Sequence, residues 1–143
     1  MEIKFLDLEH IDVVIQYENL YLGSSLGRDY IINDINNNPY ARYLMAIEQG
    51  ELIGYIGINV DTFGEILNLF VIESQRNQGV AKALLNEALY YAKKAGSESI
   101  SLEVKETNIA AIELYRLFGF EASHKRKGYY NGVDAILMIK KLR

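Results

Sequence analysis

Alternating and continuous runs of hydrophobic residues predict several β-strands along the chain. In residues 99–104, Ile100, Leu102 and Val104 alternate with polar side chains, as expected for a strand with one buried face. Residues 66–72 are almost continuously apolar, which indicates a central strand buried on both faces. The predicted strands are 2–6, 41–48, 52–59, 65–72, 99–104, about 120–126 and 133–141.

Hydrophobic residues spaced near 3.6 positions predict helices between these strands. The apolar stripe of the third helix is formed by Val80, Ala83, Leu84, Ala88 and Tyr91. Thr107 or Asn108 can cap the start of the fourth helix, and Gly96 and Gly119 are suitable residues to end the third and fourth. The predicted helices are 8–20, 28–36, about 79–95 and about 108–118.

Glycine and asparagine positions predict the connections. Gln49-Gly50 is expected to turn a β-hairpin, and Gly64 is expected to end the turn that precedes strand 65–72. The last two strands are expected to join around residues 128–132, a stretch that begins and ends with glycine.

Composition limits the class of protein. A chain of 143 residues is long enough for one domain with a substantial core, here taken as 1–143, and too short for two ordinary ones. Without cysteine there can be no disulfide, thiolate nucleophile or cysteine metal site, and two isolated histidines give no reason to expect a metal. No apolar stretch reaches membrane-spanning length, and the first residues lack a signal-peptide core, so we expect a cytoplasmic protein without a membrane partner.

The charge balance adds little about partners. The formal net charge of −4 argues against a general nucleic-acid surface. Basic residues gather near the end of the chain, where we expect a solvated hairpin and tail rather than a binding patch. They are Lys125, Arg126, Lys127, Lys140, Lys141 and Arg143.

The stretch 73–85, ESQRNQGVAKALL, contains the most specific motif, in which Arg76, Gly79 and Ala81 form Arg-x-x-Gly-x-Ala. It follows a predicted buried strand and opens a predicted helix. The free N–H groups of a helix's first turn and the helix dipole attract anions, and small residues allow close approach, which points to a pyrophosphate. An ordinary strand–turn–helix connection explains the pattern equally well. The spacing matches neither a P-loop nor a dinucleotide fingerprint.

Further motifs follow in order: Leu102-Glu103-Val104, Asn108, Leu114-Tyr115 with Gly119-Phe120, and Tyr129-Tyr130 followed by Asp134-Ala135. With the turn, they make residues 42–142 resemble the GNAT superfamily of acetyl-CoA-dependent N-acetyltransferases, and within it the RimI branch, which acetylates the N-terminal alanine of ribosomal proteins. The resemblance implies an α/β (α+β) fold. A mixed, mostly antiparallel central sheet would be flanked by helices in the order β-α-α-β-β-β-α-β-α-β-β.

The resemblance also implies catalytic roles for two residues. Acetyl transfer to an amine needs a base for the amine and a proton for the departing thiolate. Glu103 is the implied base, although the strand pattern alone favours a solvated carboxylate. Tyr115 is the implied acid, on the helix face shared with Asn108, although the pattern alone is more typical of a core tyrosine.

Acetyl-CoA is the implied co-substrate, held without a metal. The backbone of residues 69–71 would pair with its pantetheine arm, the turn would surround its pyrophosphate, and Asn108 and Tyr115 would contact it. The implied acetyl-CoA-binding residues are Leu69, Phe70, Val71, Arg76, Asn77, Gln78, Gly79, Val80, Ala81, Lys82, Asn108 and Tyr115.

The acceptor is less clearly indicated. Tyr129 and Tyr130 match paired tyrosines that line the peptide slot of N-terminal acetyltransferases. However, residues 22–27 lack the Pro- and Trp-containing segment usual in the RimI branch, a segment that helps form the acceptor side. The expected acceptor is a protein N-terminus, such as that of a ribosomal protein. A small-molecule amine, a protein lysine or a non-catalytic acyl-CoA-binding module are the alternatives, and the sequence allows a monomer or a homodimer.

Overall fold

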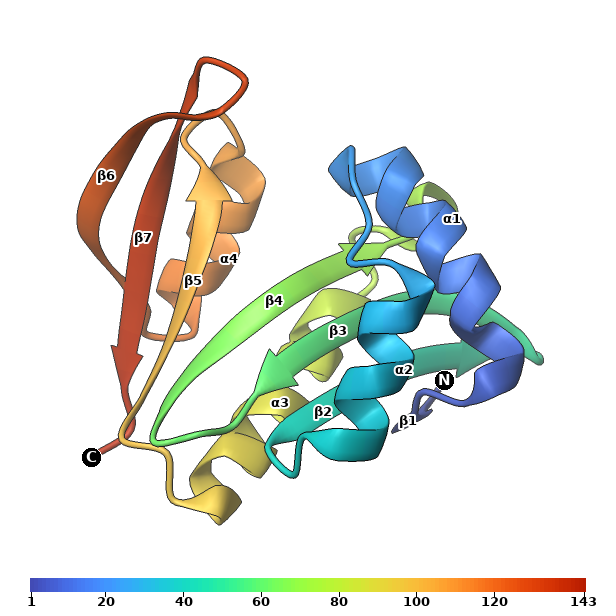
Figure 1. The fold of residues 1–143 in the computed structure, drawn as a ribbon. Coiled ribbons are helices and arrows are strands. Elements are labelled where there is room, and N and C mark those ends of the chain that lie inside the picture. Colours follow the sequence, from blue (N-terminus) through green and yellow to red (C-terminus); the bar gives the residue numbers. More distant parts are fainter.

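The computed structural model describes the backbone of residues 1–143 and every side chain except that of Tyr130. Strands and helices follow the predicted order (Figure 1). The strands are β1 (Glu2–Phe5), β2 (Ala41–Glu48), β3 (Glu51–Asn59), β4 (Phe63–Val71), β5 (Ser99–Lys105), β6 (Glu121–Tyr130) and β7 (Val133–Lys141). The α-helices are α1 (Ile11–Leu22), α2 (Arg28–Asn37), α3 (Val80–Ala95) and α4 (Ile109–Leu117), with 3₁₀ turns at Leu8–His10 and Glu73–Gln75.

All seven strands form one sheet in the order β1-β2-β3-β4-β5-β7-β6. Every neighbouring pair is antiparallel except β4 and β5, which run parallel. The hairpin between β2 and β3 turns at Gln49 and Gly50, whose φ angles are both positive, as a tight two-residue turn requires. The sheet is therefore the mixed, mostly antiparallel sheet that the sequence predicted.

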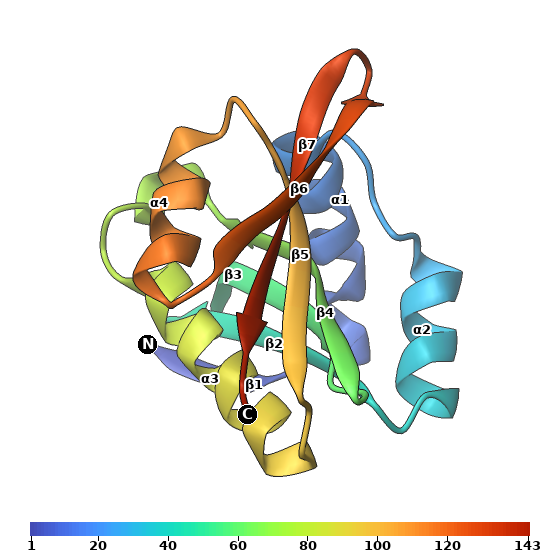
Figure 2. The same cartoon turned by 90° about the vertical axis from the view of Figure 1, so that its left-hand side faces the viewer.

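Helices cover the two faces of the sheet, with α3 and α4 on one side and α1 and α2 on the other (Figure 2). One hydrophobic cluster joins α3 and α4 to the sheet, and a second joins α1 and α2 to β2, β3 and β4. Strands β2 and β3 are buried almost throughout because both of their faces are covered. In β5 only alternate residues, Ile100, Leu102 and Val104, are buried.

Strands β4 and β5 pair over a short distance and then diverge. Their register extends only from Phe63 opposite Ser99 to Glu65 opposite Ser101, and Figure 1 shows the two strands spreading apart beyond it. Gly64 lies at this junction. A Cβ atom there would come within 2.5 Å of both the carbonyl oxygen of Asn59 and Cδ1 of Ile100. Gly64 therefore allows the close approach that joins the two halves of the sheet.

Several predicted boundaries were wrong. The first helix begins at Ile11, because Leu8–His10 forms a 3₁₀ turn, and Gly64 lies inside β4 rather than in the turn before it. Strand β6 continues to Tyr130, so that the hairpin turns at residues 131–132 instead of spanning 128–132. Asn108, rather than Thr107, caps α4. Among the described residues, no helix is long and apolar enough to cross a membrane.

Candidate active site

The edge of β4 that faces β5 is open along its second half. The Ile72 N–H donates to the Ile53 carbonyl of β3, whereas the Val71 carbonyl accepts from Nε of Arg76, on the other side of the strand. Backbone groups of successive residues in a strand point alternately to its two sides. The backbone groups of Leu69 and Val71 therefore face the open edge, and those of Phe70, one of the expected acetyl-CoA contacts, face β3.

The turn that follows β4 leads into α3 with its backbone amides exposed. Asn77 and Gly79 have φ angles of 62° and 84°, and Gly79 is the N-cap of α3. A Cβ atom on Gly79 would meet no atom within 4 Å, so the space in front of the helix is open. The first-turn amides of α3, from Val80 to Lys82, have no acceptor within the helix. This arrangement fits the anion site predicted from the motif.

Not every residue of the motif faces that space with its side chain. Val80 is buried and packs against β3, where a Cβ atom on Gly54 would lie 2.9 Å from its Cγ1. Only the backbone of Val80 is therefore available at the turn. Asn77, Gln78 and Lys82 are exposed and Ala81 is partly exposed.

Arg76 is fixed by two contacts that the sequence did not predict. Besides its bond to the Val71 carbonyl, its guanidinium lies over the ring of Tyr21, 5.0 Å from the ring centroid. The hydroxyl of Tyr21 accepts a hydrogen bond from the Glu73 N–H. Arg76 thus joins the end of β4 to the end of α1, a contact that holds the turn in place.

Glu103 lies on β5, on the face opposite to the buried Leu102 and Val104, as the alternation predicted. Its Oε1 accepts from Nη1 of Arg126 on β6 at 2.6 Å. Its Oε2 is buried and has no hydrogen-bond partner among the residues with described side chains. The carboxylate is thus held by one oxygen, and the other can accept a proton from a ligand.

Glu65 is a second carboxylate at this site. It pairs in register with Ser101, which lies two residues before Glu103, so Glu65 and Glu103 occupy the same face of neighbouring strands. Burial and the negative charge of Glu103 raise the pKa of Glu65. Across from it, Tyr30 of α2 has its own pKa raised by burial, by Asp34 and by Glu65. Two carboxylates therefore lie close together on this face of the sheet, one of them paired with the guanidinium of Arg126.

Tyr115 and Asn108 lie on α4, behind the open edge of β5. The Asn108 side chain caps the helix by accepting from the Ala111 N–H at 3.2 Å. Tyr115 is 8% exposed and packs edge-on against Phe120, with ring centroids 5.8 Å apart. The packing role that the pattern allowed for Tyr115 is therefore real, and its hydroxyl remains a candidate proton donor.

The β6–β7 hairpin projects beyond the sheet (Figure 1), and its Arg126 reaches Glu103. Tyr129 is half-exposed, and the Arg126 guanidinium stacks on its ring at 4.1 Å from the centroid. Arg126 and Lys125 are exposed, as expected for a solvated hairpin, but each also forms an ion pair. Arg126 bonds to Glu103 on β5, and Lys125 bonds to Glu106, just after β5. The side chain of Tyr130 lies outside the described residues.

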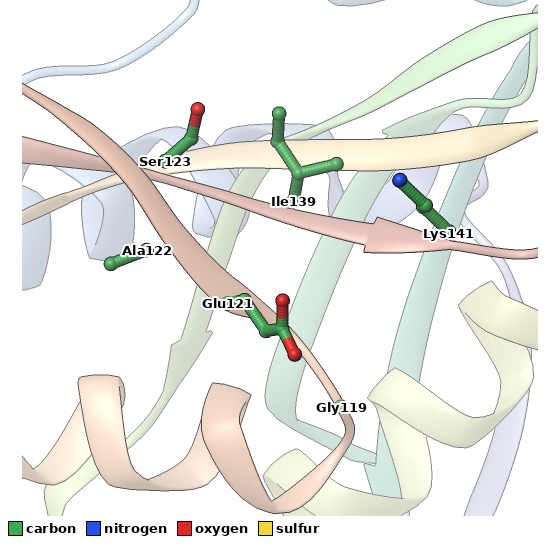
Figure 3. Close-up of a pocket in the computed structure, with 6 residues that line it drawn as sticks. All are labelled: Gly119, Glu121, Ala122, Ser123, Ile139 and Lys141. Atoms are coloured by element: carbon green, nitrogen blue, oxygen red, sulfur yellow. The ribbon is translucent and has the colours of Figure 1, made fainter.

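A surface hollow and a cluster of titratable side chains lie outside this site. A hollow on β6 and β7, shown in Figure 3, is lined by Gly119, Glu121, Ala122, Ser123, Ile139 and Lys141. It lies on the sheet face that carries Glu103, but near the beginning of β5. At the other end of the molecule, Asp7, Glu9 and His10 place ligand atoms within 4.8 Å of one another. There the Asp7 carboxylate caps a 3₁₀ turn and bonds to His10, which accounts for the cluster.

Sequence reasoning missed four residues around the site: Glu18, Glu65, Arg126 and Tyr21. Glu18 had a readable signal, because it continues the stripe of Ile11 and Val14 with helical spacing and is a charged residue on a buried face. The other three had no local signal. Their contacts join residues 23 to 55 positions apart in the chain, and register or packing creates them.

Comparisons with known proteins agree with this geometry. The Acetyltransferase (GNAT) family matches residues 12–120. A Bacillus subtilis protein provisionally named as a ribosomal protein bS18-alanine N-acetyltransferase is 34% identical over 139 residues, which cover 95% of this chain and 92% of that protein. An N-alpha-acetyltransferase of Sulfolobus acidocaldarius is 29% identical over 152 residues, which cover 96% of this chain and 90% of the Sulfolobus protein.

Among solved structures, Ard1 from Thermoplasma volcanium superposes with a TM-score of 0.89 at 23% identity, over 99% of this chain and 97% of that one. This likeness concerns the fold, and it confirms the predicted arrangement of sheet and helices. The family match covers most of the chain and agrees with the motifs at the turn, on β5 and on α4. This protein belongs to the Acetyltransferase (GNAT) family.

Proposed function

We propose that this protein transfers the acetyl group of acetyl-CoA to the N-terminal α-amino group of a protein. The observation that carries the proposal is the divergence of β4 and β5. It leaves the β4 edge open between the N-terminus of α3 and the carboxylate of Glu103. The names of the two relatives, one for ribosomal protein bS18 and one for N-alpha acetylation, support this acceptor class.

Acetyl-CoA would be bound mainly by backbone groups. The backbone groups of Leu69 and the N–H of Val71, whose carbonyl is bound by Arg76, can pair with the amides of the pantetheine arm as an added strand would. The first-turn amides of α3 would bind the pyrophosphate, with Gly79 leaving room for it. The amide nitrogen of Asn108 can reach toward the same ligand while its oxygen caps α4. Lys82 would add a charge contact from the surface.

Glu103 would act as the base. An α-ammonium group has a pKa of about 8, so only modest help is needed to free the amine near neutral pH. Oε2 is placed to take that proton, because Oε1 is held by Arg126. The amine nitrogen then bonds to the thioester carbonyl carbon, and a β4 N–H stabilises the resulting oxyanion. When the carbon–sulfur bond breaks, the Tyr115 hydroxyl protonates the thiolate, and the new amide nitrogen gives up its extra proton to solvent, from which Tyr115 is reprotonated.

The acceptor would enter between the β6–β7 hairpin and the connection from α1 to α2. Tyr129 and Tyr130 lie on the first side, and the acidic residues Glu65 and Glu103 would attract the cationic N-terminus. A ribosomal protein is the acceptor that the Bacillus relative's name indicates. Such an acceptor and acetyl-CoA meet in the cytoplasm, which agrees with the location expected from the sequence.

The test is a substrate panel. Purified protein is incubated with acetyl-CoA and three acceptors: an alanine-initiated peptide, the same peptide blocked at its N-terminus but carrying a lysine, and small polyamines. Release of free CoA gives the rate, and mass spectrometry locates the acetyl group. We expect acetylation of the free N-terminus. Modification of only the lysine peptide or only the polyamines would reject the acceptor class. If none of the three acceptors is acetylated, a non-catalytic acyl-CoA-binding module is favoured.

A further inference from the structure

Glu18 is a fully buried acid on α1, with 0% of its surface exposed. Burying a carboxylate is costly unless it is paired, and an apolar residue of similar size would normally be cheaper at such a position. Among the described side chains, Glu18 forms no ion pair with lysine or arginine. Its two oxygens instead accept two short hydrogen bonds from neutral donors.

These bonds join α1, the connection that follows it and β4. Ser25 Oγ donates to Oε1 at 2.7 Å, and Asn68 Nδ2 donates to Oε2 at 2.6 Å. Ser25 Oγ in turn accepts from the Gly27 N–H at 2.9 Å. Glu18 therefore ties the connection between α1 and α2, residues 23–27, to β4 at the residue that precedes the open position of Leu69.

The choice of partners is selective. The hydroxyl of Tyr55 is buried near Glu18 and makes no hydrogen bond with any described residue. Burial above all, followed by the charge of Glu18, raises the pKa of Tyr55 well above its ordinary value. Both oxygens of the carboxylate bond to Ser25 and Asn68 and not to this phenol. Its geometry is thus set by the connection and by β4 rather than by the aromatic core around it.

We propose that Glu18 is a positioning residue for the acceptor: it sets the connection 23–27 at a fixed distance from the acetyl-bearing edge of β4. The inference rests on the proposed function. Figure 1 shows this connection and the β6–β7 hairpin on opposite sides of the diverging strands. The connection lacks proline and aromatic residues and includes two glycines, so it has little stiffness of its own. The bond to Ser25 supplies the missing restraint.

The experiment compares Glu18→Gln, Ser25→Ala and Ser25→Thr in steady-state assays with an alanine-initiated peptide. Ser24→Ala is the matched control, because Ser24 is the exposed neighbour and takes no part in the network. Loss of a hydrogen bond to a charged group should raise the KM for the peptide about tenfold. The KM for acetyl-CoA should stay within about twofold, since the turn and α3 bind it. Ser25→Thr keeps the hydroxyl and should restore the peptide KM.

In Ser25→Ala, a general loss of structure would raise both KM values or lower only the amount of active protein, and either result would overturn the proposal. So would an unchanged peptide KM in Ser25→Ala. If Glu18→Gln does not fold, the three serine variants decide the matter alone.

Hydrogen–deuterium exchange separates this inference from the proposed function, since it needs no acceptor. Amides of residues 23–27 should exchange faster in Ser25→Ala than in wild type or Ser24→Ala. If wild type acetylates no peptide, the proposed function fails, while faster exchange still supports the restraint by Glu18. Unchanged exchange rejects the restraint whatever the substrate.

Discussion

Nη1 of Arg126 lies 2.6 Å from Oε1 of Glu103, while Oε2 of the same carboxylate is buried without a partner among the described side chains. Arg126 also stacks on Tyr129, so the position of Glu103 is coupled to the hairpin that borders the proposed acceptor site. One oxygen is used for orientation and the other is available for proton transfer. This division of roles fits a base better than a solvated surface carboxylate.

Glu103→Gln keeps the shape of the side chain and removes the proton acceptor. We expect kcat to fall by about 10²- to 10⁴-fold near neutral pH. Partial recovery is expected above pH 8, because the α-amine is then largely free, whereas a lysine acceptor would need a pH near 10.4. Acetyl-CoA affinity, measured by calorimetry, should hardly change. Superimposable pH–rate profiles for the variant, wild type and the exposed-strand control Glu121→Gln would remove Glu103 from the mechanism.

Tyr115→Phe removes only the phenolic oxygen and preserves the ring that packs against Phe120. We expect kcat to drop by about 10²-fold or more, with a much smaller effect on acetyl-CoA binding. The melting temperature checks that packing is intact, and Tyr90→Phe, at a half-exposed tyrosine of α3, is the control. Near-normal turnover would make Tyr115 a core residue alone.

Gly79→Glu places a side chain and a negative charge in the open space before α3. Binding of acetyl-CoA should be lost, because the carboxylate would occupy the phosphate site and repel its charge. Gly50→Glu is a close control, since Gly50 has a φ of 80°, compared with 84° for Gly79, and equal free space, but lies in the β2–β3 hairpin. Calorimetry on both folded variants measures their affinity for acetyl-CoA. Equal affinities would mean that the turn does not hold the phosphates.

Glu65→Gln tests the acidic pair through stability. A raised pKa means that the folded state holds the Glu65 proton more tightly than the unfolded chain. The resulting stability is present below the ordinary pKa of 4.5 and is lost as pH rises through the raised value. At pH 7 the variant should therefore be more stable than wild type, by no more than about 1 kcal/mol because solvent screens a side chain that is only partly buried.

Urea denaturation of wild type, Glu65→Gln and the exposed control Glu51→Gln at several pH values measures this difference. The advantage of Glu65→Gln should shrink as pH falls through the raised pKa and be gone below 4.5, where both chains carry a neutral group. A constant difference at every pH would indicate a packing effect instead of the charge of Glu103.

The local pattern of hydrophobic and polar residues was sufficient to predict the strands and helices. It also predicted on which face of an element a given side chain lies. The alternation of Ile100, Leu102 and Val104 placed Glu103 on the opposite face of β5, as the structure has it. The Arg76 to Ala81 motif marked the turn before α3, because backbone conformation at a glycine depends on few neighbours. These properties follow from side-chain periodicity and steric freedom, both of which act over a few residues.

The surroundings of those residues were decided by tertiary structure. The pairing of Glu103 with Arg126, the closeness of Glu65 and the anchoring of Arg76 by Tyr21 all join segments that meet only when the sheet has closed. The divergence of β4 and β5, which opens the site, depends on a parallel pairing limited to three residue pairs beside Gly64. Strand register and the contacts it creates are determined by the whole core, so no short stretch of sequence encodes them.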